Sequence, residues 1–126
     1  MRTNYLLSST LIGCLIFIIS CQQNRINPPG IELITTDLTH YSSVADEMTI
    51  EIDIWDDIEV STYDIELLSD SGFRYFFDQK QVNKPFHKIS YEFDLSQTSE
   101  NFSVKLNVTD NENNISKSDI KITVKE

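Results

Sequence analysis

The sequence contains few of the residue types on which catalytic and metal centres depend. Its 126 residues include two cysteines, two histidines and three glycines. Scattered glycines exclude a loop that cradles phosphate, and no Gly-x-Ser-x-Gly nucleophile motif is present. His40 and His87 lie far apart with no neighbouring cysteine, whereas a zinc site needs three or four regularly spaced ligands. We therefore expect no enzyme and no catalytic residue, with carboxylate pairs of the glycosidase type as an open alternative.

Cysteine is confined to the start of the chain. Cys14 and Cys21 lie within the first 21 residues, so residues 22–126 contain no thiol. We expect that part to have no disulfide, although an exported protein would permit one. Its stability then depends on a hydrophobic core alone.

Basic charge is also scarce. The chain carries 10 Lys and Arg against 20 Asp and Glu. Residues 1–20 contain Arg2 and no acid, so the remainder carries 9 basic against 20 acidic residues, a net charge of −11. This excess argues against nucleic acid as a partner and against electrostatic docking on anionic headgroups. It is compatible with a solvated exported protein and permits cation binding.

One long hydrophobic run occurs, from Tyr5 to Ile19, between a basic start and the pair Ser20-Cys21. This order is typical of a secretory signal. The run is interrupted by polar and small residues, whereas a permanent membrane span usually has about 20 cleaner apolar residues. We predict that residues 1–20 are a signal peptide.

The end of this signal, Ile18-Ile19-Ser20-Cys21, resembles the lipobox of bacterial lipoproteins. The resemblance implies that Cys21 is diacylated and becomes the new N-terminus. Leu11-Ile12-Gly13-Cys14 fits the same pattern, but too little hydrophobic sequence precedes it and a strongly apolar stretch follows it. The alternative is an ordinary signal peptide or a weak membrane anchor with an incidental cysteine.

Residues 21–30 are polar and contain the pair Pro28-Pro29, which predicts a lipidated tether that is extended near the prolines. Position 22 is Gln rather than Asp, so the sorting rule known from enteric bacteria implies the outer membrane of a Gram-negative envelope. No acidic run follows Cys21. The surface-export tag of some Bacteroidetes-type lipoproteins is therefore missing, and the face of the membrane stays open.

Residues 31–126 are predicted to form one all-β domain, centred on residues 48–68. Ile50, Ile52 and Ile54 alternate with polar residues, and so do Tyr63, Ile65 and Leu67. Period-two alternation indicates strands with one buried face. Because Asp56-Asp57 interrupts the pattern, we expect two strands joined by an acidic turn.

Further alternation predicts strands at residues 31–34, 73–77, 87–93, 102–108 and 120–124. Residues 79–85 are expected to be a loop, because proline is awkward inside a central strand, and residues 35–46 a crossing between sheets or an irregular edge. The total is about seven antiparallel strands in a β-sandwich, with the last two as a hairpin. We expect no helix.

Asp56-Asp57-Ile58 before a strand, and residues 108–114 (VTDNENN) between the last two strands, resemble bacterial immunoglobulin-like domains. With the lipobox and the proline-led first strand, the chain is similar to short Bacteroidetes-type lipoproteins. The resemblance implies an immunoglobulin-like β-sandwich. Members of that fold share no single activity.

In an immunoglobulin-like topology the two acidic turns lie at one end of the sandwich. That arrangement would bring together four carboxylates, namely Asp56, Asp57, Asp110 and Glu112, with Asn111 and Asn114 beside them. Calcium takes six to eight oxygen ligands of this kind, so calcium is the candidate cofactor. The favoured alternative is turn chemistry, in which Asp and Asn bind their own backbone, because the chain has no dense Asp-x-Asp-x-Asp-Gly run.

Residues 73–77 (FRYFF) are rich in aromatic side chains. Alternation sends Phe73, Tyr75 and Phe77 to one face and Phe76 to the other. If the first face is core, Phe76 is exposed, and so is Trp55, which is out of phase with its neighbouring isoleucines. Both are candidate contacts for a protein or glycan partner, unless they pack over sheet edges or under loops.

These features favour a lipid-anchored, non-catalytic binding or adhesion module of the cell envelope. The alternative is a structural accessory subunit of an outer-membrane protein complex.

Overall fold

The computed structural model describes residues 27–96 and 98–126, so the predicted signal peptide, Cys21 and the first part of the tether lie outside it. The described residues form six strands and no helix, and hence no helix long and apolar enough to cross a membrane. The strands are β1 (Gly30–Leu33), β2 (Thr39–Tyr41), β3 (Glu47–Ser69), β4 (Arg74–Asp94), β5 (Phe102–Asp110) and β6 (Ile115–Lys125). The predicted all-β class is confirmed.

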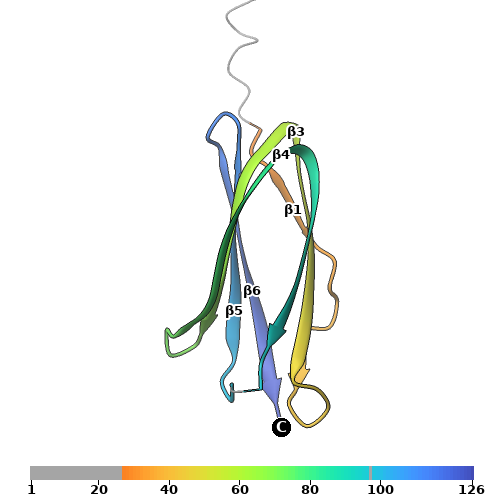
Figure 1. Cartoon of the computed structure of the whole chain (residues 1–126), viewed down its shortest axis with the longest axis vertical. Helices are drawn as coiled ribbons and strands as arrows, with labels where there is room; N and C mark the ends of the chain where they lie inside the picture. Colours follow the sequence, from red (N-terminus) through yellow and green to blue (C-terminus); the bar gives the residue numbers. More distant parts are fainter. Residues whose placement is uncertain (1–26, 97) are drawn as a thin grey trace, which may run out of the picture.

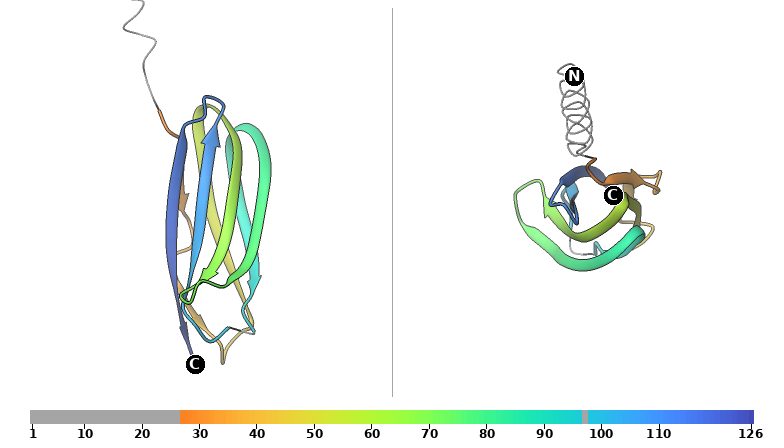
Figure 2. Two further views of the ribbon diagram at one scale, coloured as in Figure 1. Left: turned by 90° about the vertical axis from the view of Figure 1, so that its left-hand side faces the viewer. Right: turned by 90° about the horizontal axis from the view of Figure 1, so that it is seen from above.

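Two long strands, β3 and β4, form an antiparallel hairpin that bends near its middle and contributes to both layers of the sandwich (Figure 1). The first half of β3 pairs with β1, and its second half pairs with β5. The strand order is β1-β3-β5-β6-β2, with β4 on the other side of β3. Seen from above, β3 and β4 curve together around one side of the molecule (Figure 2).

The acidic turn expected at Asp56-Asp57 is instead a bend inside β3. The pairing steps from Trp55 opposite Phe86 to Val60 opposite Lys84. Residues 56–59 therefore stand against a single residue of β4, and such extra residues bend and twist a strand. A turn and a bend both interrupt alternation, so the prediction of two strands here was wrong.

The loop expected at residues 79–85 is likewise part of a strand. Pro85 lies in β4 where the pairing with β3 is interrupted, so its missing N–H costs no ladder hydrogen bond there. In the described structure β4 pairs only with β3, and proline is tolerated on such edge strands. Asn83 takes a left-handed φ of 53° in the same stretch.

The expected edge at residues 35–46 contains one short strand, β2, which runs parallel to the end of β6. β3 and β4 each replace two expected strands, and β2 was not expected as a strand. The described structure therefore has six strands where seven were expected. The predicted hairpin of β5 and β6 is confirmed. The immunoglobulin-like topology is not confirmed, because β3 and β4 each run through both layers and β2 pairs in parallel.

The core is built from the apolar positions that the alternation identified. Ile54, Ile65 and Leu106 are fully buried. Val104 and Val108 on β5 and Ile120 and Ile122 on β6 face the same interior. The core therefore lies between the layers, and the strands bend or turn at the two ends of the sandwich.

Candidate functional site

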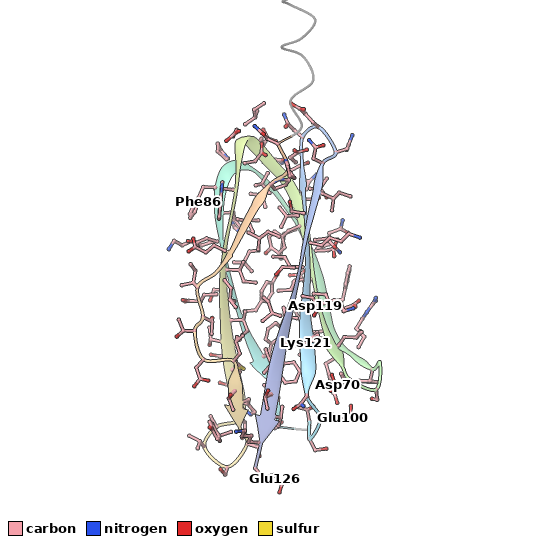
Figure 3. All side chains as sticks on the ribbon, turned by 180° about the vertical axis from the view of Figure 1, so that it is seen from behind. Asp70, Phe86, Glu100, Asp119, Lys121 and Glu126 are labelled. Atoms are coloured by element: carbon pink, nitrogen blue, oxygen red, sulfur yellow. The ribbon has the colours of Figure 1, made fainter. Side chains whose placement is uncertain are left out.

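The molecule has two distinct ends. The N-terminal end comprises residues 27–29, 55–59, 84–86 and 110–115, and the described chain enters the fold there. The C-terminal end comprises residues 69–77 and 98–101 together with the chain terminus. Figure 3 shows Phe86 near the first end and Asp70, Glu100 and Glu126 at the other.

The N-terminal end contains the predicted acidic group. One pocket of about 190 Å³ is lined by its four carboxylates and by two further side chains, namely Asp56, Asp57, Asp110, Glu112, Asn27 and Ile58. The bend of β3 supplies the first two acids, and the β5–β6 turn supplies the other two. The structure therefore brings together residues that are more than fifty positions apart in the sequence.

Three of these acids, Asp56, Asp57 and Asp110, already accept hydrogen bonds from the protein's own N–H groups. Asp56 Oδ2 accepts from the backbone amides of Ile58 at 3.0 Å and Glu59 at 3.1 Å. Asp57 Oδ2 accepts from the side-chain amide of Asn27 at 2.9 Å. These bonds fix the bend of β3 and hold the incoming chain against it.

Asp110 is the most buried of the four acids, with 3% of its surface exposed. Its Oδ1 accepts from the amides of Glu112 at 2.9 Å and Asn114 at 2.8 Å, and its Oδ2 accepts from Asn114 Nδ2 at 2.9 Å. Asn113, with a φ of 65°, completes this turn. Asparagine tolerates the left-handed region better than most residues, which is how the turn forms without glycine.

These contacts are the turn chemistry that the sequence favoured. Among the described residues, no group of three or more His, Cys, Asp or Glu side chains is arranged to hold a metal ion. His40 is buried on β2, and His87 on β4 stacks on Tyr63 at 5.7 Å. Calcium at the four acids stays a prediction.

The structure reverses the predicted faces of the aromatic segment. Phe76 opposes the core residue Leu67 and packs against Tyr91 at 5.3 Å and Phe93 at 5.5 Å between ring centres. Phe73 and Phe77 are instead 62% and 50% exposed. The exposed position expected for Phe76 was therefore wrong. Alternation gave the relative phase of the aromatic residues but not which face is core.

Three exposed rings, Phe73, Tyr75 and Phe77, form what we call the aromatic surface of the C-terminal end. Phe73 and Tyr75 meet edge to face at 4.9 Å. The guanidinium of Arg74 lies 5.1 Å from the ring centre of Phe77 and pairs with Glu66. This surface was not predicted from the sequence. The signal that could have located it is Leu67, because the residue opposite this core position, Phe76, must also face the core, which leaves Phe73, Tyr75 and Phe77 on the outer face.

Trp55 is exposed as expected, at 41%. Its indole lies directly over Gly30, where a Cβ would collide with the ring. Its cross-strand partner Phe86 is 47% exposed, and Ile58 in the bend is 58% exposed. Phe86 and Ile58 were not predicted as candidates, because the pairing that places Phe86 opposite Trp55 and the bend that exposes Ile58 are known only from the structure.

A hydrogen-bonded chain of side chains joins the two halves of β4. Tyr91 donates from its hydroxyl to Asp78 Oδ2 at 2.6 Å, and the hydroxyl of Tyr63 lies 3.2 Å from that of Tyr91. The bond from Tyr91 lowers the pKa of Asp78 below its ordinary value. Burial, followed by the bond to Asp78, raises the pKa of Tyr91. These bonds tie the first half of β4 to its second half and to β3.

No family model matches the sequence, and no curated protein matches it. The fold is similar to superoxide reductase (neelaredoxin) from Ignicoccus hospitalis, with a TM-score of 0.57 and 9% identity over 82% of this chain and 85% of that one. It is also similar to Spo0M, a sporulation control protein from Bacillus subtilis, with a TM-score of 0.56 and 10% identity over 80% and 51% of the two chains. These TM-scores indicate a similar fold, and identities of 9% and 10% transfer no activity.

The solved structures also include a conjugative transposon lipoprotein from Bacteroides eggerthii. It is 18% identical over 77% of this chain and 98% of that chain, with a TM-score of 0.43. That score is too low to carry an argument about this chain.

Proposed function

We propose that the protein is a lipid-anchored, non-catalytic interaction module of the cell envelope, which presents the aromatic surface of its C-terminal end to a protein partner. The observation that supports this most directly is the position of that surface. Phe73, Tyr75 and Phe77 lie in and next to the β3–β4 turn. Figure 1 shows this turn at the end opposite to the one where the described chain enters the fold from the side of the predicted anchor at Cys21.

The composition of the aromatic surface favours a protein as the partner. Exposed Tyr and Phe side chains next to an Arg are the residue types enriched in protein interfaces. The ion pair of Arg74 with Glu66 and its position over Phe77 hold these side chains in place, so little conformational freedom is lost on binding. A glycan is the alternative ligand, since aromatic rings also stack on sugars.

A second candidate function is a structural subunit of a larger outer-membrane complex. The observation that favours it is the outer side of β4, which pairs with no strand of the described structure. Such an edge can accept a strand from another chain. Lys80, Lys84 and Lys88 along β4 oppose unselective pairing of this kind, which makes the aromatic surface the stronger candidate.

Site-specific photo-crosslinking in cells tests the partner. A photoreactive phenylalanine in place of Phe77 should give one or a few discrete protein adducts. The same group at Asp119, on the exposed outer face of β6 (Figure 3), should give none. Equal adducts at both positions, or none at either, would refute a protein partner at the aromatic surface.

The anchor is tested separately. Cys21→Ala should abolish labelling by radioactive palmitate and release the protein from the membrane fraction. Labelling that persists in Cys21→Ala and disappears in Cys14→Ala would assign the lipid to the other cysteine.

A further inference from the structure

Four large apolar side chains are exposed at the N-terminal end. Trp55 is 41% exposed, Ile58 58%, Phe86 47% and Ile115 55%. They come from four separate places in the chain, namely β3, its bend, β4 and the start of β6. Exposed apolar groups that gather from separate elements indicate a contact surface.

These side chains surround the point where the chain enters the fold. Trp55 lies over Gly30, and Ile58 lines the same pocket as Asn27. Ile115 directly precedes Ser116, whose hydroxyl donates to the carbonyl oxygen of Pro29. The start of the described chain is thus fixed between the bend of β3 and the β5–β6 turn (Figure 3).

The length of chain outside the structure limits how far this end can be from a lipid on Cys21. Five residues lie between Cys21 and Asn27, and the six Cα–Cα steps that join these two residues span only about 20 Å even when fully extended. The nine residues of β5 alone measure about 30 Å. The N-terminal end is therefore the part of the fold that the anchor keeps next to the bilayer.

We propose that the domain rests on the bilayer surface through Trp55, Ile58, Phe86 and Ile115. This proposal rests on the proposed lipid anchor at Cys21. Tryptophan and other aromatic side chains favour the headgroup level of a membrane, where one part of the ring is apolar and the other wet. The contact orients the domain, so that the aromatic surface of the C-terminal end points away from the membrane.

The charge of this end specifies the kind of lipid surface. Five acidic residues share this end with the four apolar side chains, namely Asp56, Asp57, Glu59, Asp110 and Glu112, and Lys84 is its one basic residue. Carboxylates near anionic headgroups are repelled. The surface that fits is a zwitterionic one, such as phosphatidylethanolamine or phosphatidylcholine, in which the apolar side chains alone drive the contact.

Trp55 is the only tryptophan in the chain, so its fluorescence reports on this contact directly. The full-length lipidated protein is incorporated into phosphatidylcholine vesicles that contain brominated acyl chains, and flotation shows that it is bound. Bromine should quench most of the Trp55 emission. Added phosphatidylglycerol should weaken the quenching, and Ile58→Ser with Ile115→Ser should weaken it without preventing flotation.

The matched control moves the fluorophore to the other end. The variant Trp55→Phe with Phe73→Trp places the single tryptophan in the aromatic surface, where a substitution at a 62% exposed position is tolerated. This variant should float equally well, and the brominated acyl chains should not quench its tryptophan emission. Lipid contact at the N-terminal end predicts a large difference between the two proteins.

The outcomes separate this inference from the anchor. Protein that floats while Trp55 stays unquenched, or while both tryptophans are quenched alike, would overturn the proposed contact and leave the anchor intact. A blue-shifted but unquenched Trp55 would mean that another protein copy covers this end instead, which also overturns it. Protein that does not float would contradict both the anchor and the contact.

Discussion

The two ends of the sandwich expose apolar side chains to a similar degree, yet their backbones are ordered in different ways. At the C-terminal end, Ser69 and Phe73 close the β3–β4 turn, with Gly72 at a φ of 91°. At the N-terminal end, carboxylates accept the amides that the bend of β3 and the β5–β6 turn leave free.

The difference shows what each residue type does at a chain reversal. The β3–β4 hairpin pairs the amides of Ser69 and Gly72 with backbone carbonyls and that of Phe73 with the hydroxyl of Ser69, and glycine adopts the positive φ of this turn without strain. In the bend of β3 the amides of Ile58 and Glu59 lie outside the ladder, so a side-chain oxygen of Asp56 accepts them. Asp56 and Asp110 therefore serve the path of the backbone at the N-terminal end.

The largest effect is expected for the buried acid of the N-terminal end. Asp110→Ala should lower the free energy of unfolding by about 3 kcal/mol, because it removes three hydrogen bonds to a buried carboxylate and leaves their donors unsatisfied. Asp56→Ala, in a more open position with two such bonds, should cost about 1 kcal/mol. Urea denaturation measures both. Losses of equal size would contradict the difference in burial between Asp110 in the β5–β6 turn and Asp56 in the bend of β3.

The same measurements in millimolar calcium sharpen this comparison. If the acids serve only the backbone, calcium should leave the unfolding midpoint unchanged in the wild type. A rise that disappears in Asp57→Asn would instead support the predicted metal site.

The next largest difference in stability is expected between substitutions of two neighbouring rings at the C-terminal end. Phe76→Ala should destabilise the fold by about 2 kcal/mol, since the ring packs against Tyr91 and Phe93. Phe77→Ala, on the exposed face, should change stability by less than about 0.5 kcal/mol. Urea denaturation decides between them. Equal losses would mean that the ring of Phe77 also contributes to the core.

These two rings also show how much of the packing can be predicted from the sequence. Period-two alternation placed Ile50, Ile52 and Ile54 in the core correctly, because each polar neighbour identifies the wet face. Residues 73–77 have aromatic side chains on both faces, so composition cannot tell which face is core. The phase is fixed by the partner strand, where Leu67 opposes Phe76.

The interruptions at Asp56-Asp57 and at Pro85 were harder to interpret. A turn that ends a strand and a bend that continues it both place polar residues between two alternating stretches. The choice between them depends on pairing with the neighbouring strand, which a single sequence does not contain. The acids at positions 56, 57, 110 and 112 were recognisable as a group, and the favoured turn chemistry matches the bonds of Asp56 and Asp110. The bond from Asn27 to Asp57 could not be predicted, because it depends on where the incoming chain lies.

The smallest expected effect concerns the join between the two halves of β4, which lies between the two ends. The hydroxyl of Tyr91 lowers the pKa of Asp78 in the folded protein below the ordinary value of 3.8. A lowered folded pKa means that the carboxylate contributes fully to stability above the unfolded pKa, and that this contribution is lost as pH falls through the folded pKa. Tyr91→Phe removes the cause of the shift.

The stability of Tyr91→Phe should accordingly fall less than that of the wild type between about pH 7 and about pH 2, as measured by urea midpoints at both pH values. Tyr63→Phe is the matched control, because it removes a hydroxyl that contacts Tyr91 but donates no bond to Asp78. It should keep the wild-type pH dependence. An identical fall in all three proteins would show that Asp78 is stabilised by Lys80, 3.6 Å away, rather than by Tyr91. The join would then depend on aromatic packing between Phe76 and Tyr91 alone.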